Sequence, residues 1–257
     1  MDKLKVVKIG GNVIENKAEL HRFLTDFSTL KGPKILVHGG GKEATQMAKQ
    51  LQIPVQISNG RRITDAANLD IITMLYAGKI NKNIVAQLQA LGCDALGLSG
   101  ADGNSIRANK RPTHPVDFGF VGDITTVNTS FFKQLLTAGI TPVCCAISHD
   151  GNGQLLNTNA DTIAAAIAGS LSKTDTVTLY YCFEKPGVLK NVTDNNSVLP
   201  KIDFKMYQQL QEEGRIAQGM LPKLSNCFDA LNEGVTEVKI GLPEMIRGNT
   251  VHTQIIL

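Results

Sequence analysis

Short runs of apolar residues alternate along this chain with stretches in which apolar residues recur every three or four positions. Short continuous runs are typical of buried strands, and the wider spacing is typical of amphipathic helices. We expect strands at residues 4–9, 34–37, 93–98, 141–146, 176–182, 236–240 and 251–256. We expect helices near residues 17–30, 41–51, 65–91, 129–138, 160–170, 203–213 and 219–233. This alternation predicts an α/β fold with a mainly parallel sheet.

Two segments interrupt this alternation. Residues 104–127 combine alternating apolar and polar positions with turn residues, which predicts a β-hairpin. Residues 147–158 predict a second hairpin, turning at Asp150-Gly151-Asn152-Gly153. The sequence shows no internal repeat or flexible linker, so residues 1–257 are expected to form one domain. Any boundary between lobes is expected near residues 170–175, where a helix ends before a new strand.

Composition narrows the functional classes. The 257 residues can bury a sizeable core, and 42% hydrophobic and 19% charged residues are ordinary for a globular protein. A net charge of +3 without tryptophan does not suggest a nucleic-acid partner. The sequence has no signal peptide and no apolar run of membrane-spanning length, so we expect a cytoplasmic protein without a membrane partner.

The cysteines and histidines do not predict a metal site. No two cysteines have the CxxC spacing, and no histidine pair has the spacing of metal ligands. Free thiols of this kind are mostly small buried hydrophobic groups. We expect that of all five cysteines, which are Cys93, Cys144, Cys145, Cys182 and Cys227.

Two of the predicted strands end in glycines. Gly10-Gly11 follows the first strand and Gly39-Gly40-Gly41 follows the second. Such loops expose backbone N–H groups that bind anions, and Lys8 adds a cation beside the first loop. Residues 39–44 fit the dinucleotide fingerprint only nominally, because no acidic residue ends a following strand at the expected distance. We therefore predict two anion-binding loops, with phosphate as a ligand.

Three further segments carry candidate polar groups. Arg61-Arg62 precedes a helix for which Thr64 or Asp65 is the expected N-cap. The two arginines could bind a carboxylate or phosphate, or they could both be exposed to solvent. Asn159 and Asp161 are explained structurally as N-cap and first-turn residue of the next helix. Lys223 lies in a first helical turn, where a cation opposes the helix dipole, which indicates that it faces an anion.

Taken together, these segments resemble the N-acetylglutamate kinases of the amino-acid kinase family. The match is collinear over nearly the whole chain. It comprises Lys8–Gly11, His38–Gly41, Asn59–Thr64, Gly97–Gly103, Gly119–Asp123, Asn157–Asp161 and Gly219–Lys223. The resemblance implies a three-layer αβα sandwich around a mainly parallel sheet. It also implies an acyl-glutamate-binding and dimerisation lobe at residues 1–172 and an ATP-binding lobe at residues 173–257.

The reaction implied by this resemblance is the ATP-dependent phosphorylation of the γ-carboxylate of an N-acylated glutamate, in arginine biosynthesis. Mg²⁺ would be held mainly through the phosphates of ATP. A glutamate carboxylate has a pKa of about 4.3 and is ionised at neutral pH, so no general base is needed. The reaction instead requires positioning and positive charge around the phosphoryl group.

The resemblance also implies roles for individual residues. Lys8 and Lys223 would stabilise the phosphoryl group in transfer, and Asp161 would organise both lysines. The backbone N–H groups of Gly11, Gly40 and Gly41 would bind the phosphoryl group in transfer and the substrate. Arg62 and Asn157 would bind the acylated glutamate. The residues expected around the nucleotide are Gly10, Glu184, Lys185, Pro186, Gly187, Val188, Leu189, Arg215, Ile216 and Ala217.

Two residues depart from the family pattern. Glu184 stands where relatives usually carry Asp, which leaves the contacts of adenine and ribose open. Arg61 stands where they usually carry an apolar residue near the acyl methyl group. A second guanidinium there would suit an N-succinylglutamate substrate, and the alternative is that Arg61 points to solvent. Arginine-inhibited members of the family carry an added N-terminal helix that joins dimers into hexamers, whereas the first strand of this sequence is expected to begin at residue 4. The resemblance therefore implies a homodimer that is insensitive to arginine and is joined through residues 65–91.

Other functions remain open at this point. A uridylate kinase would need a nucleotide acceptor pocket, and glutamate 5-kinases often carry a further domain. A non-catalytic relative that binds nucleotides or anions is the alternative from another class. The presence of Lys8, Asp161 and Lys223 together argues against that alternative.

Overall fold

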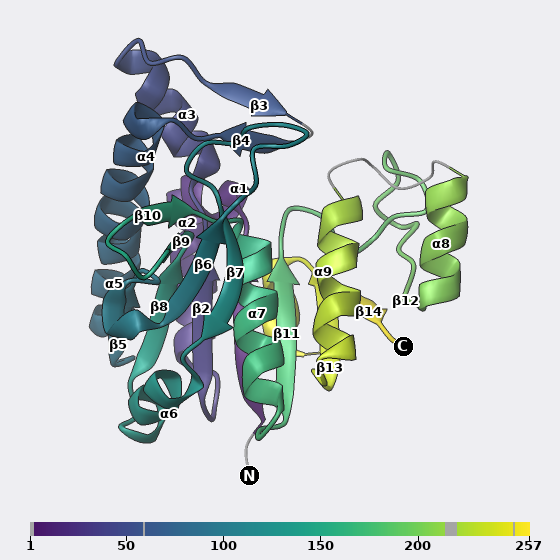
Figure 1. Cartoon of the computed structure of the whole chain (residues 1–257). Helices are drawn as coiled ribbons and strands as arrows, with labels where there is room; N and C mark the ends of the chain where they lie inside the picture. Colours follow the sequence, from purple (N-terminus) through teal and green to yellow (C-terminus); the bar gives the residue numbers. More distant parts are fainter. Residues whose placement is uncertain (1–2, 59, 214–219, 249) are drawn as a thin grey trace. The chain divides into compact units, whose positions relative to one another are not determined.

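The computed structural model describes residues 3–58, 60–213, 220–248 and 250–257. By its internal contacts the chain forms two compact units. Figure 1 labels the helices and strands that belong to them. Unit 1 comprises Met1–Ile35 and Ala164–Leu257, and unit 2 comprises Leu36–Ile163. The first strand therefore belongs to the same unit as the C-terminal third of the chain.

Unit 1 contains a mostly parallel set of strands. Their order is β1 (Leu4–Ile9), β11 (Val177–Cys182), β13 (Glu237–Gly241), β14 (Thr253–Ile255) and β12 (Lys201–Ile202). β1 is parallel to β11 with Lys8 opposite Tyr181, β11 is parallel to β13, and β14 is antiparallel to β13. Every residue of β11 is buried. Such unbroken burial is typical of a parallel strand covered on both faces.

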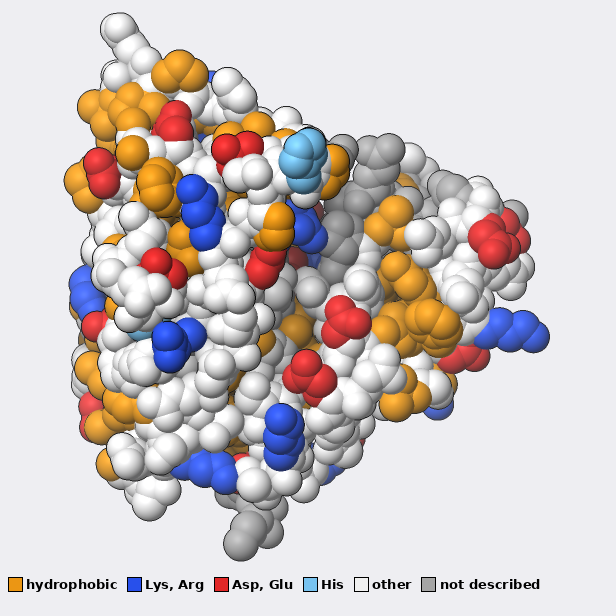
Figure 2. All heavy atoms as spheres, in the orientation of Figure 1, with side chains coloured by type: hydrophobic (Ala, Val, Ile, Leu, Met, Phe, Trp, Pro, Cys, Tyr) orange, Lys and Arg blue, Asp and Glu red, His pale blue; other side chains and the backbone are white. Residues whose placement is uncertain are grey.

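The helices of unit 1 include α1 (Gly11–Glu15), α2 (Lys17–Ser28), α8 (Phe204–Glu212), α9 (Leu221–Asn232) and the 3₁₀ segment η3 (Pro243–Arg247). The helix α7 (Ala160–Ser172) begins in unit 2 and continues into unit 1. The rings of Phe204, Tyr207 and Phe228 join α8 to α9, with centroids 5.2–6.1 Å apart. Figure 2 shows hydrophobic side chains gathered over this pair of helices.

Unit 2 contains three parallel strands and two smaller sheets. β8 (Thr141–Cys145) pairs in parallel with β2 (Lys34–His38), whose first residues lie in unit 1, and with β5 (Ala95–Leu98). The second sheet has the order β10 (Leu155–Asn157), β9 (Ile147–His149), β6 (Ile106–Lys110) and β7 (Gly122–Val127). β3 (Gln56–Ser58) and β4 (Arg61–Ile63) form an antiparallel pair.

The helices of unit 2 are arranged along the chain as α3 (Gly41–Gln50), α4 (Ala66–Thr73), α5 (Asn81–Ala90) and α6 (Thr129–Thr137), with a 3₁₀ turn η2 (Asp102–Asn104). Between α4 and α5 the chain stays helical but forms a π-helix, η1 (Met74–Ile80). The helix predicted over residues 65–91 is therefore continuous but not uniformly α-helical. Seven-residue π-helices are rare, and π segments frequently mark functional sites.

Most of the predicted organisation is confirmed. The α/β class is confirmed, and the strands of unit 1 and the set β2, β8 and β5 of unit 2 are mainly parallel. The hairpins predicted at residues 104–127 and 147–158 are present as the antiparallel pairs β6–β7 and β9–β10. The expected strand at residues 93–98 begins only at Ala95, and that at 251–256 is confined to β14. α1 and the β3–β4 pair were not predicted, because segments of three to five residues carry too little periodicity.

Two further sequence expectations concern membrane segments and thiols. Across the described ranges, no helix has the length and apolar character that a membrane crossing requires. All five cysteines are free and buried, as predicted. The functional division into residues 1–172 and 173–257 stays a prediction. The two units defined by contacts have other bounds, since β1 lies in the same unit as β11 and β13.

Candidate active site

In unit 1, the end of β1 carries Lys8 and Gly10. Lys8 is 9% exposed and lies opposite Tyr181 in the register of β1 and β11. The Gly10 N–H donates to the carbonyl oxygen of Cys182 at 3.0 Å, and α1 begins at the next residue. A Cβ atom at Gly10 would lie 3.4 Å from the same carbonyl oxygen. The first glycine loop is therefore held against the end of β11.

Lys223 lies close to the same strand end in unit 1. Its Nζ atom is 5.3 Å from the ring centroid of Tyr181 and 5.8 Å from that of Phe183. Aromatic faces attract cations at such distances. Burial raises the pKa of the intervening Cys182 thiol, and the positive charges of Lys8 and Lys223 both oppose this rise. The two predicted lysines therefore both act on the carboxyl end of β11.

The loop after β11 contains the residues expected around the nucleotide. The Val188 N–H donates to Thr253 Oγ1 at 2.8 Å, and that hydroxyl donates to the Leu199 carbonyl at 2.7 Å. A Cβ atom at Gly187 would lie 2.6 Å from Thr253 Oγ1, so a larger residue does not fit without rearrangement. Thr253 in β14 thus fixes the middle of this loop.

The remaining residues of this group differ in their surroundings. Glu184 is exposed, whereas Leu189 is buried and pairs with Val198. Lys185 Nζ donates to Asn195 Oδ1 at 3.4 Å, and the Pro186 carbonyl lies against Gly241. The predicted nucleotide contacts Arg215, Ile216 and Ala217 lie outside the described residues.

In unit 2, His38 forms a hydrogen bond with the second glycine loop. The Nδ1 atom of this buried imidazole lies 2.9 Å from the Gly39 carbonyl oxygen, and Nε2 lies 3.0 Å from the Asn81 amide nitrogen. That nitrogen also donates to the Val143 carbonyl, so Nε2 accepts and Nδ1 donates. Burial lowers the pKa of His38 from 6.5 to about 4. A neutral imidazole thus positions the Gly39 carbonyl.

The π-helix η1 packs directly against Gly40. A Cβ atom at this position would lie 2.4 Å from Ile80 Cδ1 and 2.9 Å from two ring carbons of Tyr76. Contacts this short are essentially never made by real Cβ atoms. Gly41 has more room, since the nearest atom to its Cβ position is Tyr76 Oη at 3.7 Å. Close packing therefore requires glycine at position 40.

Arg62 in β4 is bonded to the first turn of α3. Its Nη2 atom donates to the Gly41 carbonyl at 2.9 Å and to Thr45 Oγ1 at 2.6 Å. Its Nη1 atom lies 3.5 Å from Asn68 Oδ1. Guanidinium has five N–H donors in a planar fork, so these contacts fix its position and leave donors for a ligand.

Arg61 precedes Arg62 in the same strand and is exposed. Successive side chains of a strand point to opposite faces. Since Arg62 faces Gly41 and Thr45, Arg61 is directed to the other face of β4. In a regular strand such as β4, the two arginine side chains therefore cannot both point toward the same ligand.

Asn157 is joined to the residues that follow Arg62. Its amide nitrogen donates to Thr64 Oγ1 at 3.0 Å, and its backbone N–H donates to the Phe120 carbonyl at 2.9 Å. The Phe120 N–H in turn donates to the Thr64 carbonyl at 2.7 Å. Gly119, at a φ of 70°, allows this approach, because its Cβ position lies 2.3 Å from the Thr64 oxygen.

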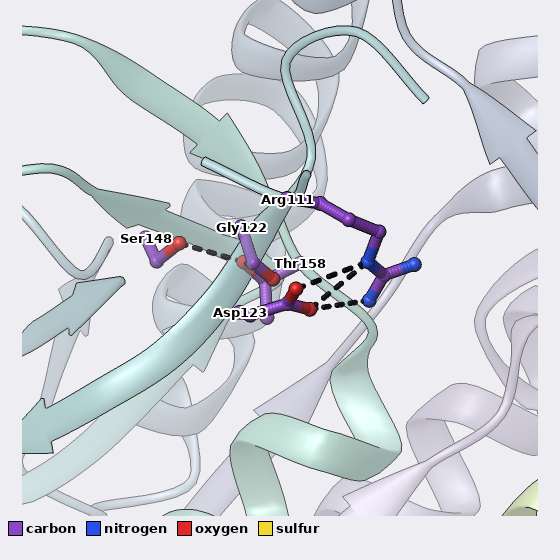
Figure 3. Close-up of polar contacts among 5 residues, drawn as sticks. All are labelled: Arg111, Gly122, Asp123, Ser148 and Thr158. Carbon is purple, nitrogen blue, oxygen red and sulfur yellow. Dashed lines mark hydrogen bonds and ion pairs between the residues drawn. The ribbon is translucent and has the colours of Figure 1, made fainter. Parts of the chain in front are cut away.

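A pair of buried hydroxyl groups anchors the segment after Asn157. Ser148 Oγ and Thr158 Oγ1 are 2.6 Å apart, and Thr158 Oγ1 donates to the Gly122 carbonyl at 3.4 Å (Figure 3). The same figure shows the Arg111 guanidinium against the Asp123 carboxylate, with Nε 3.0 Å from Oδ1. The contacts of Thr158 tie β7, β9 and the segment between β10 and α7 together, next to Asn157.

Asp161 lies in the first turn of α7. Asn159 Oδ1 accepts the backbone N–H groups of Asp161 at 2.8 Å and Thr162 at 3.3 Å, which confirms Asn159 as the predicted N-cap. Asp161 belongs to unit 2, whereas Lys8 and Lys223 belong to unit 1. Its action on the two lysines stays a prediction. The described part of the chain contains no cluster of three or more His, Cys, Asp or Glu residues arranged for a metal ion.

Sequence reasoning missed several residues that position this site. Thr45 lies one helical turn after Gly41 on α3, so its spacing was an available signal. Asn68 and Tyr76 carried no such signal, because their contacts depend on how α4 and η1 pack against β4 and the second glycine loop. The residues of unit 2 that the structure brings together are Gly40, Gly41, Thr45, Arg62, Thr64, Asn68, Tyr76 and Asn157.

The chain is similar to known proteins over nearly its whole length. The chain matches the Amino acid kinase family over residues 3–241. An acetylglutamate kinase from Bacteroides thetaiotaomicron is 52% identical over 248 residues, which cover 96% of each chain. Another from Cytophaga hutchinsonii is 50% identical and covers 100% of this chain and 99% of its own. The structure of smu.665 from Streptococcus mutans UA159 has a TM-score of 0.81 at 25% identity, covering 99% of both chains.

The extent of these matches settles both fold and family. The likeness to a solved structure over 99% of both chains supports the predicted amino-acid kinase fold. The sequence matches cover nearly the whole chain at about half identity. The chain belongs to the amino acid kinase family, within the branch of the acetylglutamate kinases.

Proposed function

We propose that the chain transfers the γ-phosphoryl group of ATP to the γ-carboxylate of N-acetyl-L-glutamate, forming N-acetylglutamyl 5-phosphate in arginine biosynthesis. The observation that carries this proposal is the 52% identity to an acetylglutamate kinase over 96% of both chains. The polar cluster of unit 2 supports it, because Arg62, Asn157 and the second glycine loop offer donors suited to a carboxylate.

The chemistry requires charge stabilisation rather than proton transfer. A γ-carboxylate oxygen attacks the γ-phosphorus, the bond from phosphorus to the bridging oxygen breaks, and ADP leaves. The acceptor is already ionised, since its pKa is about 4.3. Negative charge spreads over the phosphoryl oxygens during transfer. We assign its stabilisation to Lys8, Lys223 and the Gly11 N–H, with Asp161 holding the lysines in place.

The fixed position of Arg62 suits a substrate-binding role. Two of its donors are bonded to Gly41 and Thr45, so a ligand carboxylate would meet a guanidinium that is already oriented. We assign one carboxylate of N-acetyl-L-glutamate to its remaining donors. Asn157, held by Thr64, and the N–H groups of Gly40 and Gly41 would complete the contacts.

We assign the nucleotide to unit 1, beside Gly10 and the loop that Thr253 fixes. Mg²⁺ would rest mainly on the ATP phosphates, because this hard cation prefers oxygen ligands and keeps much of its water shell. We also propose a cytoplasmic homodimer formed through α4, η1 and α5. The apolar Met74 on η1 is 59% exposed, which supports an interface there.

N-Succinylglutamate is the alternative substrate, and it is not favoured. The relatives carry the name acetylglutamate kinase. Arg61, which motivated the alternative, lies on the face of β4 opposite to Arg62. We therefore assign the acetyl group to the substrate.

The proposal is tested by trapping the product. The purified chain is incubated with ATP, Mg²⁺ and N-acetyl-L-glutamate, and hydroxylamine converts the acyl phosphate to a hydroxamate while ADP is measured in parallel. N-Succinyl-L-glutamate and L-glutamate serve as competing acceptors. We expect the highest kcat/KM with N-acetyl-L-glutamate. A higher value with the succinyl compound would reassign the substrate, and no hydroxamate with any acceptor would indicate a non-catalytic binding protein.

A further inference from the structure

The side chain of Tyr76 lies beneath the second glycine loop in unit 2. Its ring carbons come within 2.9 Å of the Cβ position of Gly40, and its hydroxyl oxygen lies 3.7 Å from that of Gly41. The residue is only 5% exposed. Tyr76 belongs to η1, so the π-helix places this side chain at the start of α3.

The hydroxyl group of Tyr76 has no bonding role among the residues that the structure describes. No hydrogen-bond partner of Tyr76 Oη occurs within the described ranges of the chain, although buried polar groups are normally bonded. Its oxygen lies beside the second glycine loop, 3.7 Å from the Cβ position of Gly41. A buried ring thus places a hydroxyl group next to the start of α3.

The surroundings of this hydroxyl suit an anion. Burial raises the pKa of Tyr76 to about 12, and the nearby positive charge of Arg62 opposes this rise. The hydroxyl therefore stays protonated at neutral pH and can donate. Arg62 also donates to the Gly41 carbonyl at 2.9 Å. A neutral O–H donor and a permanent guanidinium cation are therefore close to the same turn of α3.

We propose that the Tyr76 hydroxyl donates a hydrogen bond to the α-carboxylate of the acyl-glutamate, beside Arg62. This inference rests on the function proposed above. The α-carboxylate keeps its full charge throughout the reaction, whereas the γ-carboxylate becomes an acyl phosphate. A permanent cation with an adjacent O–H donor matches the group whose charge does not change. Tyr76 is then a substrate-binding residue as well as a packing residue.

Tyr76→Phe tests the proposal, because it removes the hydroxyl and keeps the ring against Gly40. Steady-state rates are measured with N-acetyl-L-glutamate and with N-acetyl-4-aminobutyrate, which lacks the α-carboxylate. We expect kcat/KM for N-acetyl-L-glutamate to fall about tenfold, mainly through KM, as for the loss of a hydrogen bond to a charged group. With N-acetyl-4-aminobutyrate we expect a change below about twofold, because the partner of the hydroxyl is absent.

Tyr207→Phe is the matched control, since Tyr207 lies in the aromatic cluster of α8 and α9 in unit 1. The KM for ATP and the melting temperature of Tyr76→Phe should remain those of the wild type. An equal loss with both acceptors, or no loss with either, would overturn the proposal. If the wild-type chain phosphorylates no acyl-glutamate, the proposed function fails, and the inference about Tyr76 fails with it.

Discussion

Replacing Gly40 with alanine tests the packing of the second glycine loop. The added Cβ atom would lie 2.4 Å from Ile80 Cδ1 and 2.9 Å from two ring carbons of Tyr76. The Ile80 methyl group is the end of a flexible side chain and can turn away. The Tyr76 ring is 5% exposed and has little space to move. Gly40→Ala therefore forces the loop and η1 apart.

The size of the effect follows from two opposing terms. Overpacking a well-filled site costs about 1–3 kcal/mol. Alanine in place of glycine also lowers the entropy of the unfolded chain, which favours folding by about 0.4–1 kcal/mol. We expect a net loss of about 1–2 kcal/mol, which for a chain of this size lowers the melting temperature by about 2–8 °C. Displacement of the loop should also raise the KM for N-acetyl-L-glutamate.

Differential scanning calorimetry measures the stability, with Gly39→Ala as the matched control. A Cβ atom at Gly39 would meet only Ala160 Cβ at 3.7 Å, an ordinary contact. Combining Gly40→Ala with Ile80→Val removes the shortest contact, so the double variant should lose less stability than the sum of the single losses. Equal melting temperatures for Gly40→Ala and Gly39→Ala would refute the packing of η1 against the loop.

Three further changes test the histidine, the arginine and one lysine. The folded state should lose up to about 3 kcal/mol as the pH falls from 6.5 toward 4, since unfolded His38 binds a proton that the buried imidazole excludes. His38→Asn should remove this part of the pH dependence of the melting temperature. Identical pH profiles for the variant and the wild type would contradict the role of His38 in this loss of stability. Arg62→Ala should raise the KM for N-acetyl-L-glutamate roughly a hundredfold, whereas Arg22→Ala, at an exposed position on α2, should not change it. Lys223→Met should lower kcat by about 10²–10³-fold, with little change in the affinity for N-acetyl-L-glutamate measured by calorimetry. A kcat close to that of the wild type would exclude a role of Lys223 in stabilising the phosphoryl group.

The periodic parts of the fold were predictable from the sequence. β1 and β2 are short, largely apolar runs that are followed by glycines, so both loops could be located from the sequence. The segment from α4 to α5 shows the limit of such reasoning. Its apolar spacing predicts one helix, but the π-helical turn of η1 changes which side chains face the core. Tyr76 and Ile80 therefore could not be placed beneath Gly40.

The candidate site was predictable as a set of motifs but not as an arrangement. Arg61 and Arg62 read as a pair, and only the short strand β4 separates them onto opposite faces. The approach of Lys8 to the end of β11 depends on the pairing of β1 with β11, and that of Lys223 depends on the place of α9 beside Tyr181. Local periodicity does not determine such long-range pairing.

Phosphorus NMR of the purified chain with ATP, Mg²⁺ and N-acetyl-L-glutamate is the most direct test of the proposed phosphoryl transfer. We expect an acyl phosphate signal to grow at the same initial rate as the signals of ADP. The Lys223→Met variant, at the same concentration, should produce this signal far more slowly. Unchanged ATP, or inorganic phosphate formed without any acyl phosphate, would contradict transfer to the γ-carboxylate.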